Sequence, residues 1–296
     1  MTEPTIFDLP KVNDKRGNLS FIENRKEIPF DIARTYWVYD VPGGQRRGSH
    51  AFRTQKEVIV ALSGSFDVVL HDGKRQKTYH LNRSYKALYV PEMTWRVLDN
   101  FSTNSICLVL SSGVYQESEY IRNFKEFKRL KNSGETFLSD DTSSAYAPSL
   151  VHKNELGGQS SVFDCSLIEF PVIKNRAGSI TAITNSVEVP FDVPRIFYVY
   201  DIPYGEVRGV HSHKKCHQIL IAASGSFDVE LDDGTNRRTI TLNRPTYGLH
   251  IPPGIWATQR NYSSGTICLV LTSDVYDEQH DYIREYSAFK KYKEKE

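Results

Sequence analysis

The chain has 296 residues, with 37 Lys and Arg against 36 Asp and Glu, which gives a formal net charge of +1. This balance excludes the broad cationic field that non-specific binding to nucleic acid or to anionic membranes requires. With 39% hydrophobic and 25% charged residues, the composition is typical of a globular protein and excludes dominant disorder. The length predicts two domains, each large enough to bury its own core.

The beginning of the chain carries no pattern of a secretory signal. Residues 1–10 lack both a basic region and an apolar run. The longest apolar stretches, such as 106–110 and 267–271, are far shorter than the roughly 20 residues that cross a bilayer. The four cysteines show no CxxC spacing and no disulfide pattern, which is typical of a reducing compartment. We therefore expect a cytoplasmic protein without a membrane span.

The sequence consists of two copies of one unit. Three strings recur 161 positions apart: Ser-Gly-Ser-Phe-Asp-Val at 63–68 and 224–229, Leu-Asn-Arg at 81–83 and 242–244, and Ile-Cys-Leu-Val-Leu at 106–110 and 267–271. The alignment needs no gap between Pro10 and Tyr115, which excludes chance similarity. We expect a first domain over 1–130, a linker rich in Ser, Gly and Asp over 131–162, and a second domain over 163–296.

Within each copy, short segments rich in Val, Ile, Tyr and Phe alternate with turn signals such as Asp-Gly. In the second copy, Phe227, Val229 and Leu231 alternate with polar residues, as in a half-buried strand. Towards the end of each copy, 120–128 and 282–290 place apolar residues at three- and four-residue spacing, which predicts a helix. We therefore predict an all-β fold, a barrel or jelly roll in each copy, with a short C-terminal helix.

A histidine pair in the second copy is the most informative motif for chemistry. His211 and His213 are two residues apart, so on a strand they point to the same side. A neutral imidazole accepts and returns a proton near pH 7, which suits a base that moves protons. A surface strand with two incidental histidines is the alternative that the spacing leaves open.

The His-x-His spacing also resembles the metal site of cupin barrels, but the other ligand positions do not match. Ala257 stands where such barrels have a further histidine, and His217 lies near the place of the glutamate. In the first copy, Phe52 has replaced one histidine of the pair. Since a transition metal requires three or four good ligands, we expect neither a metal nor another cofactor.

Each copy resembles the sugar-nucleotide 3,4-ketoisomerases of the cupin superfamily, which act on dTDP-4-keto-6-deoxyglucose. In the second copy the strings that carry this resemblance lie at 195–201, 208–215, 218–222, 247–256 and 281–284. The resemblance implies two tandem jelly-roll domains. It also implies an isomerase that moves the keto group from C4 to C3 through an enediol, without a metal. The product would be used to make a dTDP-3-amino-3,6-dideoxyhexose for a surface glycan such as lipopolysaccharide.

The resemblance also assigns catalytic roles. The proton-shuttling histidine of the family falls on His211 in the second copy and on His50 in the first. A second histidine falls on His213, and a proton-donating tyrosine falls on Tyr36. Each copy has lost one of these three groups to phenylalanine. We expect the second copy to be the active one, because it keeps both histidines.

The diphosphate of such a substrate requires cations, because burying its charge unpaired is costly. Arg208 and Arg47 lie just before the histidine strand in the two copies and are the cations we favour, with Lys214 as a secondary candidate. A solvated surface charge is the alternative for each of them.

Two further positions of this sequence resemble family positions that set the configuration of the product at C4. One position holds Arg16 in the first copy and Ala177 in the second, and the other holds Arg96 and Ala257. The second copy is therefore expected to offer only alanines, which leaves the configuration at C4 open.

The family resemblance implies a homodimer whose N-terminal strands are exchanged. We expect either an intrachain pseudo-dimer of the two copies, with residues 1–25 packed on the second barrel, or a homodimer. Three other functions remain open: a 3,5-epimerase on the same substrate class, a non-catalytic nucleotide-sugar-binding protein, and a metal-dependent cupin dioxygenase. The expected ligand is a dTDP-linked 4-keto-6-deoxyhexose, with no nucleic-acid or membrane partner.

Overall fold

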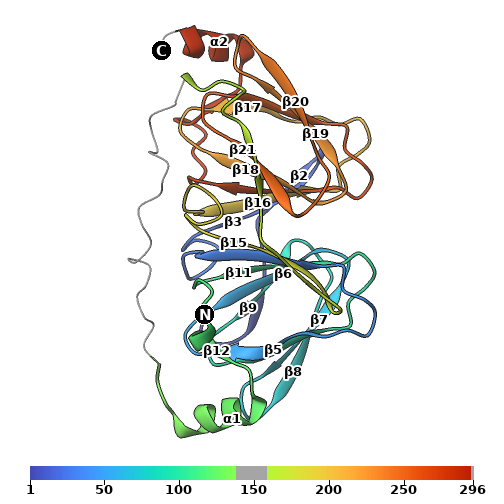
Figure 1. Ribbon diagram of the computed structural model, residues 1–296, viewed down its shortest axis with the longest axis vertical. Helices are drawn as coiled ribbons and strands as arrows, with labels where there is room; N and C mark the ends of the chain where they lie inside the picture. Colours follow the sequence, from blue (N-terminus) through green and yellow to red (C-terminus); the bar gives the residue numbers. More distant parts are fainter. Residues whose placement is uncertain (138–158, 295–296) are drawn as a thin grey trace. The chain divides into compact units, whose positions relative to one another are not determined.

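Short β-strands build both copies of the repeat (Figure 1). In the computed structural model, residues 1–137 and 159–294 are described. Most of the expected linker 131–162 lies outside these residues. The strand Phe66–His71 alternates between buried and half-buried side chains, and so does most of Phe227–Asp232, because successive side chains of a strand point to opposite faces. The all-β prediction, with two barrels and a short C-terminal helix in each copy, is confirmed.

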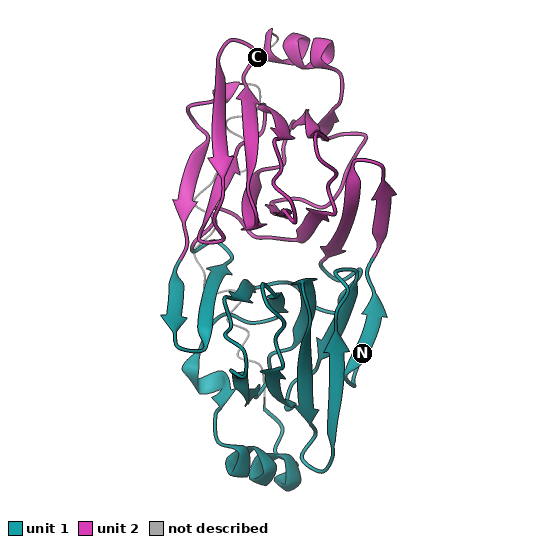
Figure 2. Ribbon diagram, turned by 90° about the vertical axis from the view of Figure 1, so that its right-hand side faces the viewer, with its two compact units in different colours: residues 1–9, 24–148, 171–187 teal, residues 10–23, 149–170, 188–296 magenta. Residues whose placement is uncertain are grey.

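Two compact units divide the chain, and each contains pieces of both sequence copies (Figure 2). Unit 1 consists of residues 1–9, 24–148 and 171–187, and unit 2 consists of residues 10–23, 149–170 and 188–296. The units therefore differ from the sequence copies by a reciprocal exchange of one short segment.

Unit 1 is built from two antiparallel sheets. The larger sheet contains, in order, β1 (Thr5–Asp8), β9 (Lys86–Val90), β6 (Glu57–Ser63), β11 (Ile106–Ser111), β4 (Arg34–Tyr39), β15 (Gly178–Thr184) and β14 (Val172–Asn175). The smaller sheet contains β12 (Tyr120–Ile121), β5 (Arg47–Phe52), β10 (Trp95–Asp99), β7 (Phe66–His71) and β8 (Gln76–Leu81). Ile59 and Val109 of the larger sheet share one buried cluster with Phe66 and Leu98 of the smaller sheet, so the core lies between the sheets.

Unit 2 repeats this architecture. Its larger sheet contains β13 (Ser166–Glu169), β21 (Tyr247–Ile251), β18 (Gln218–Ser224), β23 (Ile267–Thr272), β16 (Arg195–Tyr200), β3 (Gly17–Glu23) and β2 (Lys11–Asp14). Its smaller sheet contains β20 (Arg237–Leu242), β19 (Phe227–Asp232), β22 (Trp256–Arg260), β17 (Arg208–His213) and β24 (Tyr282–Ile283). Leu220 and Val270 face Val229 and Leu231 in its core.

The exchanged segments are β-hairpins. The hairpin of β2 and β3 comes from the first copy and pairs with β16 in unit 2, where Ile22 lies opposite Ile196. The hairpin of β14 and β15 pairs in the same way with β4 in unit 1. Strand β1 does not take part, because it pairs with β9 of its own unit. Of the residues 1–25 expected on the second barrel, the segment 10–23 therefore lies there.

A helix ends each copy after a two-residue strand. A single 3-10 turn, η1 (Glu117–Glu119), precedes β12, and α1 (Phe124–Ser133) follows it. The α1 helix is capped by Asn123, whose side chain accepts backbone N–H bonds, and ends at Gly134 with φ 69°. The second helix is α2 (Tyr286–Glu294). The predicted helices thus begin later than 120 and 282, because those residues pair with β5 and β17.

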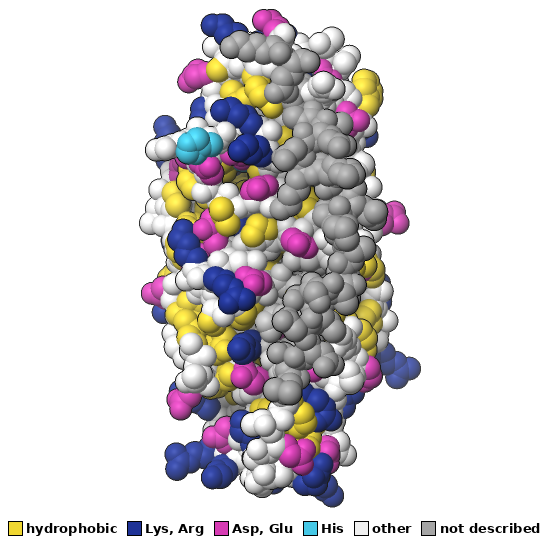
Figure 3. Space-filling model, turned by 90° about the vertical axis from the view of Figure 1, so that its left-hand side faces the viewer, with side chains coloured by type: hydrophobic (Ala, Val, Ile, Leu, Met, Phe, Trp, Pro, Cys, Tyr) yellow, Lys and Arg dark blue, Asp and Glu magenta, His cyan; other side chains and the backbone are white. Residues whose placement is uncertain are grey.

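One face of the molecule mixes charges of both signs. On the face drawn in Figure 3, side chains of Lys and Arg alternate with those of Asp and Glu. This agrees with the net charge of +1. No helix in the described part of the chain is long and apolar enough to cross a membrane.

Candidate active site

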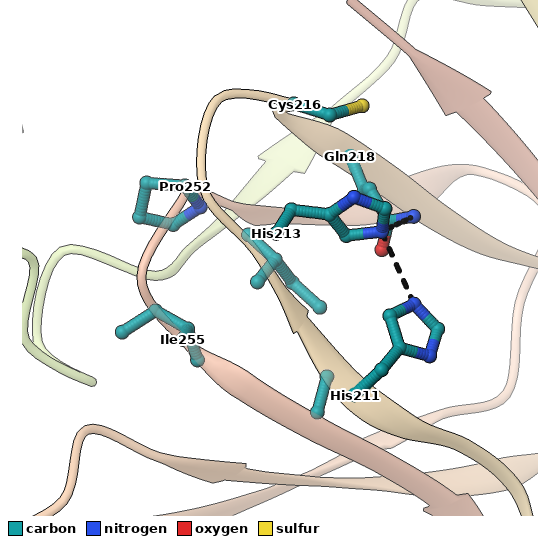
Figure 4. Close-up of a pocket in the computed structure, with 8 residues that line it drawn as sticks. His211, His213, Cys216, Gln218, Pro252 and Ile255 are labelled. Atoms are coloured by element: carbon teal, nitrogen blue, oxygen red, sulfur yellow. Dashed lines mark hydrogen bonds between the residues drawn. The ribbon is translucent and has the colours of Figure 1, made fainter. Parts of the chain in front are cut away.

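A pocket in unit 2 gathers both histidines of the sequence motif (Figure 4). It is lined by His211, His213, Cys216, Gln218, Ile251, Pro252, Ile255 and Ala257. The histidines come from β17, Gln218 begins β18, and Ala257 lies on β22. The expectation that His211 and His213 share one face of a strand agrees with this arrangement, in which both side chains line the pocket.

A bulge in β17 precedes the histidines. The register with β22 shifts between Gly209 and His211, and both Gly209 and Val210 have positive φ, 75° and 59°. A Cβ at Gly209 would lie 2.8 Å from the carbonyl oxygen of Ala257, so glycine is required here. A β-branched residue such as Val210 rarely adopts this conformation, and such strain is concentrated at functional sites.

Hydrogen bonds join the two histidines to an aspartate. His211 Nε2 lies 3.1 Å from His213 Nε2, and His213 Nδ1 lies 2.5 Å from Asp281 Oδ2 (the first of these contacts is drawn in Figure 4). Gln218 Nε2 lies 3.0 Å from His213 Nε2. Asp281 precedes β24, 68 residues after His213, and β24 pairs with β17.

The protein environment keeps His211 neutral. Desolvation, followed by the neighbouring His213, lowers the pKa of His211 to about 3. The ring of Tyr282 packs against both imidazoles, with centroid distances of 5.0 Å to His211 and 4.3 Å to His213. At pH 7 the His211 imidazole is therefore unprotonated and able to accept a proton.

The corresponding place in unit 1 has a different chemistry. His50 lies on β5, and its ring packs edge-on against Phe52 and Tyr120, each with a centroid distance of 4.9 Å. Neither ring nitrogen of His50 has a hydrogen-bond partner among the described residues. Burial, followed by the charge of Arg96, lowers the pKa of His50 to about 2. His50 is neutral but has no imidazole partner, because Phe52 replaces it.

Tyr36 belongs to a buried ion-pair network in unit 1. Its hydroxyl donates to Glu57 Oε1 at 2.6 Å and accepts from Arg96 Nη2 at 2.6 Å. Arg96 Nε also donates to Glu57 Oε2 at 2.5 Å, and the two charged side chains are 3% and 1% exposed. Burial raises the pKa of Tyr36 well above its ordinary value. The phenol is thus tied into the core of the barrel.

The candidate diphosphate ligands lie beside the exchanged hairpins. Arg208 Nη1 lies 3.4 Å from the carbonyl oxygen of Gly17 and 3.6 Å from Asp14, both on the hairpin of β2 and β3. Arg47 Nη1 donates to Asn175 at 3.0 Å in unit 1. Desolvation lowers the pKa of both guanidiniums. Lys214 is half-buried and follows β17 directly.

The hairpin exchange corrects the expectation about the positions that set the product. Arg16 lies in unit 2, where it forms a bidentate pair with Asp14, and Ala177 lies in unit 1. Unit 2 therefore combines Arg16 with Ala257, and unit 1 combines Ala177 with Arg96. The second sequence copy holds alanine at both positions, but the exchanged hairpin gives the second barrel Arg16 in place of Ala177.

The comparison with protein families agrees with this duplicated architecture. The family model described as FdtA, WxcM-like, C-terminal, matches residues 2–132 and again residues 163–294. The chain belongs to the FdtA family. The resemblance inferred from the sequence is thereby confirmed for both copies.

Several relatives of this FdtA-family chain are named as 3,4-ketoisomerases. The chain is 43% identical over 126 residues to TDP-4-oxo-6-deoxy-alpha-D-glucose-3,4-oxoisomerase of Aneurinibacillus thermoaerophilus, a match that covers 43% of the chain and 90% of the relative. Among solved structures, it resembles a 3,4-ketoisomerase from Helicobacter canadensis (40% identity, 45% and 99% of the two chains, TM-score 0.44). It also resembles the WlaRB TDP-quinovose 3,4-ketoisomerase from Campylobacter jejuni (40% identity, 44% and 99%, TM-score 0.42).

Three residues of the site were not singled out from the sequence of this FdtA-family chain: Asp281, Gln218 and Tyr282. Gln218 and Asp281 belong to strings that carried the resemblance, but no spacing rule connects either of them to His213. Strand pairing between β17 and β24 brings Asp281 and Tyr282 to the histidines. These residues are visible only in the tertiary structure.

Potential metal donors also occur in this site. Donor atoms of His213, Cys216 and Asp281 lie within 4.8 Å of one another. In the present arrangement His213 and Asp281 bond to each other, and Asp281 Oδ1 already accepts three backbone N–H groups. The donor set as arranged is therefore committed to hydrogen bonds and does not fit a tetrahedral metal.

Proposed function

We propose that the chain is a sugar-nucleotide 3,4-ketoisomerase that moves the keto group of dTDP-4-keto-6-deoxyglucose from C4 to C3, and that unit 2 performs the reaction. The observation that carries this proposal is the pair of imidazoles that lines the pocket of unit 2, with 3.1 Å between His211 Nε2 and His213 Nε2. Membership of the FdtA family and the activity for which the Aneurinibacillus relative is named support the substrate class.

The reaction requires only proton transfers. The C3 hydrogen is acidic because the neighbouring C4 carbonyl delocalises the electron pair that its removal leaves behind. A base takes this proton and O4 receives one, which gives an enediol. The O3 proton then leaves and C4 is protonated, so the carbonyl lies at C3 and the product is an isomer of the substrate. Neither an oxidant nor a reductant is consumed.

His211 is suited to act as the base. It is neutral at pH 7, lines the pocket and contacts a second imidazole. His213 accepts a hydrogen bond from His211 and stabilises the imidazolium that forms when His211 takes the C3 proton. Return of the same proton to C4 completes the shuttle.

The substrate diphosphate is assigned to the cations beside the exchanged hairpin. Arg208 and Arg16 lie on or next to this hairpin, and Lys214 follows the histidine strand. Guanidinium groups bind phosphate oxygens through two parallel N–H bonds. In this assignment the second barrel uses a cation, Arg16, that comes from the first sequence copy.

Within the cell, we place the enzyme in the cytoplasm as an intrachain pseudo-dimer. Its four cysteines are free and buried, which suits a reducing compartment. The exchange of hairpins between units takes the place of an exchange between subunits.

A 3-ketosugar nucleotide is the substrate that an aminotransferase requires to make a dTDP-3-amino-3,6-dideoxyhexose.

The test is proton NMR of the protein with dTDP-4-keto-6-deoxyglucose in deuterated buffer, with His211→Asn and the matched His50→Asn as variants. We expect a 3-keto product from the wild type and from His50→Asn, and none from His211→Asn. Loss of turnover only in His50→Asn would place the reaction in unit 1. Deuterium at C5 would instead indicate a 3,5-epimerase, and binding without any product would indicate a non-catalytic protein.

A further inference from the structure

Asp281 is held so that only one of its oxygens faces the histidines. Its Oδ1 accepts the backbone N–H groups of Lys214, Lys215 and Cys216 at 3.0, 2.7 and 3.2 Å. Its Oδ2 lies 2.5 Å from His213 Nδ1. Burial raises the pKa of this carboxyl, but the bond to His213 and the backbone N–H groups outweigh that effect, so its pKa lies below the ordinary value. The group is therefore an ionised acceptor of fixed orientation.

An ionised carboxylate can only accept, so His213 must carry its proton on Nδ1. The other side of the ring agrees with this tautomer. The Nε2 atom of Gln218 is a donor and points to His213 Nε2 at 3.0 Å, which requires a lone pair on that nitrogen. Both contacts agree with a proton on His213 Nδ1.

The tautomer of His213 makes its Nε2 an acceptor that faces His211. A proton on His211 Nε2 gives the 3.1 Å contact its donor, and the single lone pair of His213 Nε2 is then shared between His211 and Gln218. His211 Nδ1 is buried, and the backbone of Gly209 raises the pKa of the ring, against the larger effect of desolvation. The contact with His213 therefore orients the His211 ring at the pocket.

We propose that Asp281 is a positioning residue that fixes His213 with its proton on Nδ1, so that His213 Nε2 faces His211 as an acceptor. This inference rests on the proposed function for its kinetic consequence, but not for the assignment of tautomers. Asp281 also provides the negative charge that stabilises the proton once the histidine pair has accepted it.

Among the described residues of unit 1, no carboxylate bonds to the ring of His50, although an acid lies at the place of Asp281. Glu119 precedes the sequence Tyr-Ile-Arg as Asp281 does. Its Oε2 accepts from the backbone N–H and the hydroxyl of Thr54, at 3.0 and 2.9 Å, and the histidine position opposite is Phe52. Glu119 is therefore a matched control for the removal of a charge in the same type of turn.

The test compares Asp281→Asn with Glu119→Gln. Asparagine keeps an oxygen for the backbone N–H groups but presents an amide donor to His213, which forces the opposite tautomer on His213. We expect Asp281→Asn to lower kcat by about 10²–10⁴-fold with a smaller change in KM, and to move the acidic limb of the rate profile to lower pH. Glu119→Gln should keep the wild-type kcat within about twofold.

A second readout needs no substrate. Nitrogen NMR of histidine-labelled protein distinguishes protonated from unprotonated ring nitrogens, and the His211→Asn and His213→Asn variants assign the signals. We expect His213 to be protonated on Nδ1 in the wild type and on Nε2 in Asp281→Asn. An unchanged tautomer, or a kcat that stays within about threefold, would overturn the role of Asp281. If the wild type turns over no substrate while the tautomers are as stated, the proposed function fails and the positioning role stands.

Discussion

Ala257 lies directly opposite His211 where strands β17 and β22 pair. In unit 1 the equivalent pair is Arg96 opposite His50. The methyl group of Ala257 leaves space beside His211 for the pocket, whereas the guanidinium of Arg96 extends to Glu57 and Tyr36. The difference at this register position, together with Glu57 in place of Gln218, thus separates an open site from one occupied by a buried ion pair.

Arginine at position 257 should close the pocket of unit 2. In Ala257→Arg the new guanidinium would be buried beside His211 without an acid, because Gln218 stands where unit 1 has Glu57. We expect a loss of turnover of at least tenfold and a fall in the free energy of unfolding of about 3 kcal/mol. Activity assays and chemical denaturation measure the two effects.

The double variant Ala257→Arg with Gln218→Glu is the control. It rebuilds the ion pair of unit 1, so we expect it to recover most of the lost stability but none of the activity. Recovery of activity would show that the open space beside His211 is not required.

Breaking the buried pair in unit 1 should destabilise that unit. Glu57→Gln leaves the Arg96 guanidinium buried with a neutral partner, and we expect a cost of about 3–5 kcal/mol in the free energy of unfolding. Asp31→Asn breaks the exposed pair with Arg25 and should have no measurable effect. Equal unfolding midpoints for the two variants in urea would contradict the structural importance of the buried pair.

Acid should destabilise the fold, because several buried histidines are held in the neutral form. His250 stacks on His217, with Nε2 of the first 3.0 Å from Nδ1 of the second. Desolvation, followed by His217, lowers the pKa of His250 to about 4. In the unfolded chain the pKa is about 6.5, so between these values the unfolded state binds more protons and stability falls as pH falls.

This difference in the pKa of His250 alone lowers the free energy of unfolding by about 3 kcal/mol between neutral pH and pH 4, because one pKa unit corresponds to about 1.4 kcal/mol. His50 and His211, whose pKa values are also lowered, add to the loss in the same direction. Melting temperatures measured from pH 8 to pH 4 should fall steeply below pH 6.5. In His250→Gln the fall should be shallower, and an unchanged slope would contradict the assignment.

The hairpin exchange predicts that Arg16 contributes to substrate binding in unit 2. Arg16→Ala, in the first sequence copy, should raise the KM of the activity in unit 2 by about tenfold, because it removes a cation next to Arg208. Arg176→Ala changes the equivalent turn of the hairpin in unit 1 and should leave KM unchanged. Titration of both variants with dTDP measures the effect on binding directly. A KM effect confined to Arg176→Ala would mean that the exchanged hairpins do not serve the sites as assigned.

Local patterns in the sequence were sufficient for the fold class and for half of the site. The repeat at an offset of 161 predicted two copies, and alternation such as that of Phe227, Val229 and Leu231 predicted strands. These signals are local, because burial on one face of a strand imposes a period of two. The same period placed His211 and His213 together.

The sequence by itself therefore determined the duplicated all-β architecture and the histidine pair. Only the tertiary structure decided which hairpin completes which barrel, and hence that Arg16 rather than Ala177 accompanies Ala257. It alone brought Asp281 to His213 across 68 residues. Both outcomes depend on pairing between strands far apart in the chain. The alternation within a strand carries no information about its partner, because every strand of the same period offers the same backbone donors and acceptors.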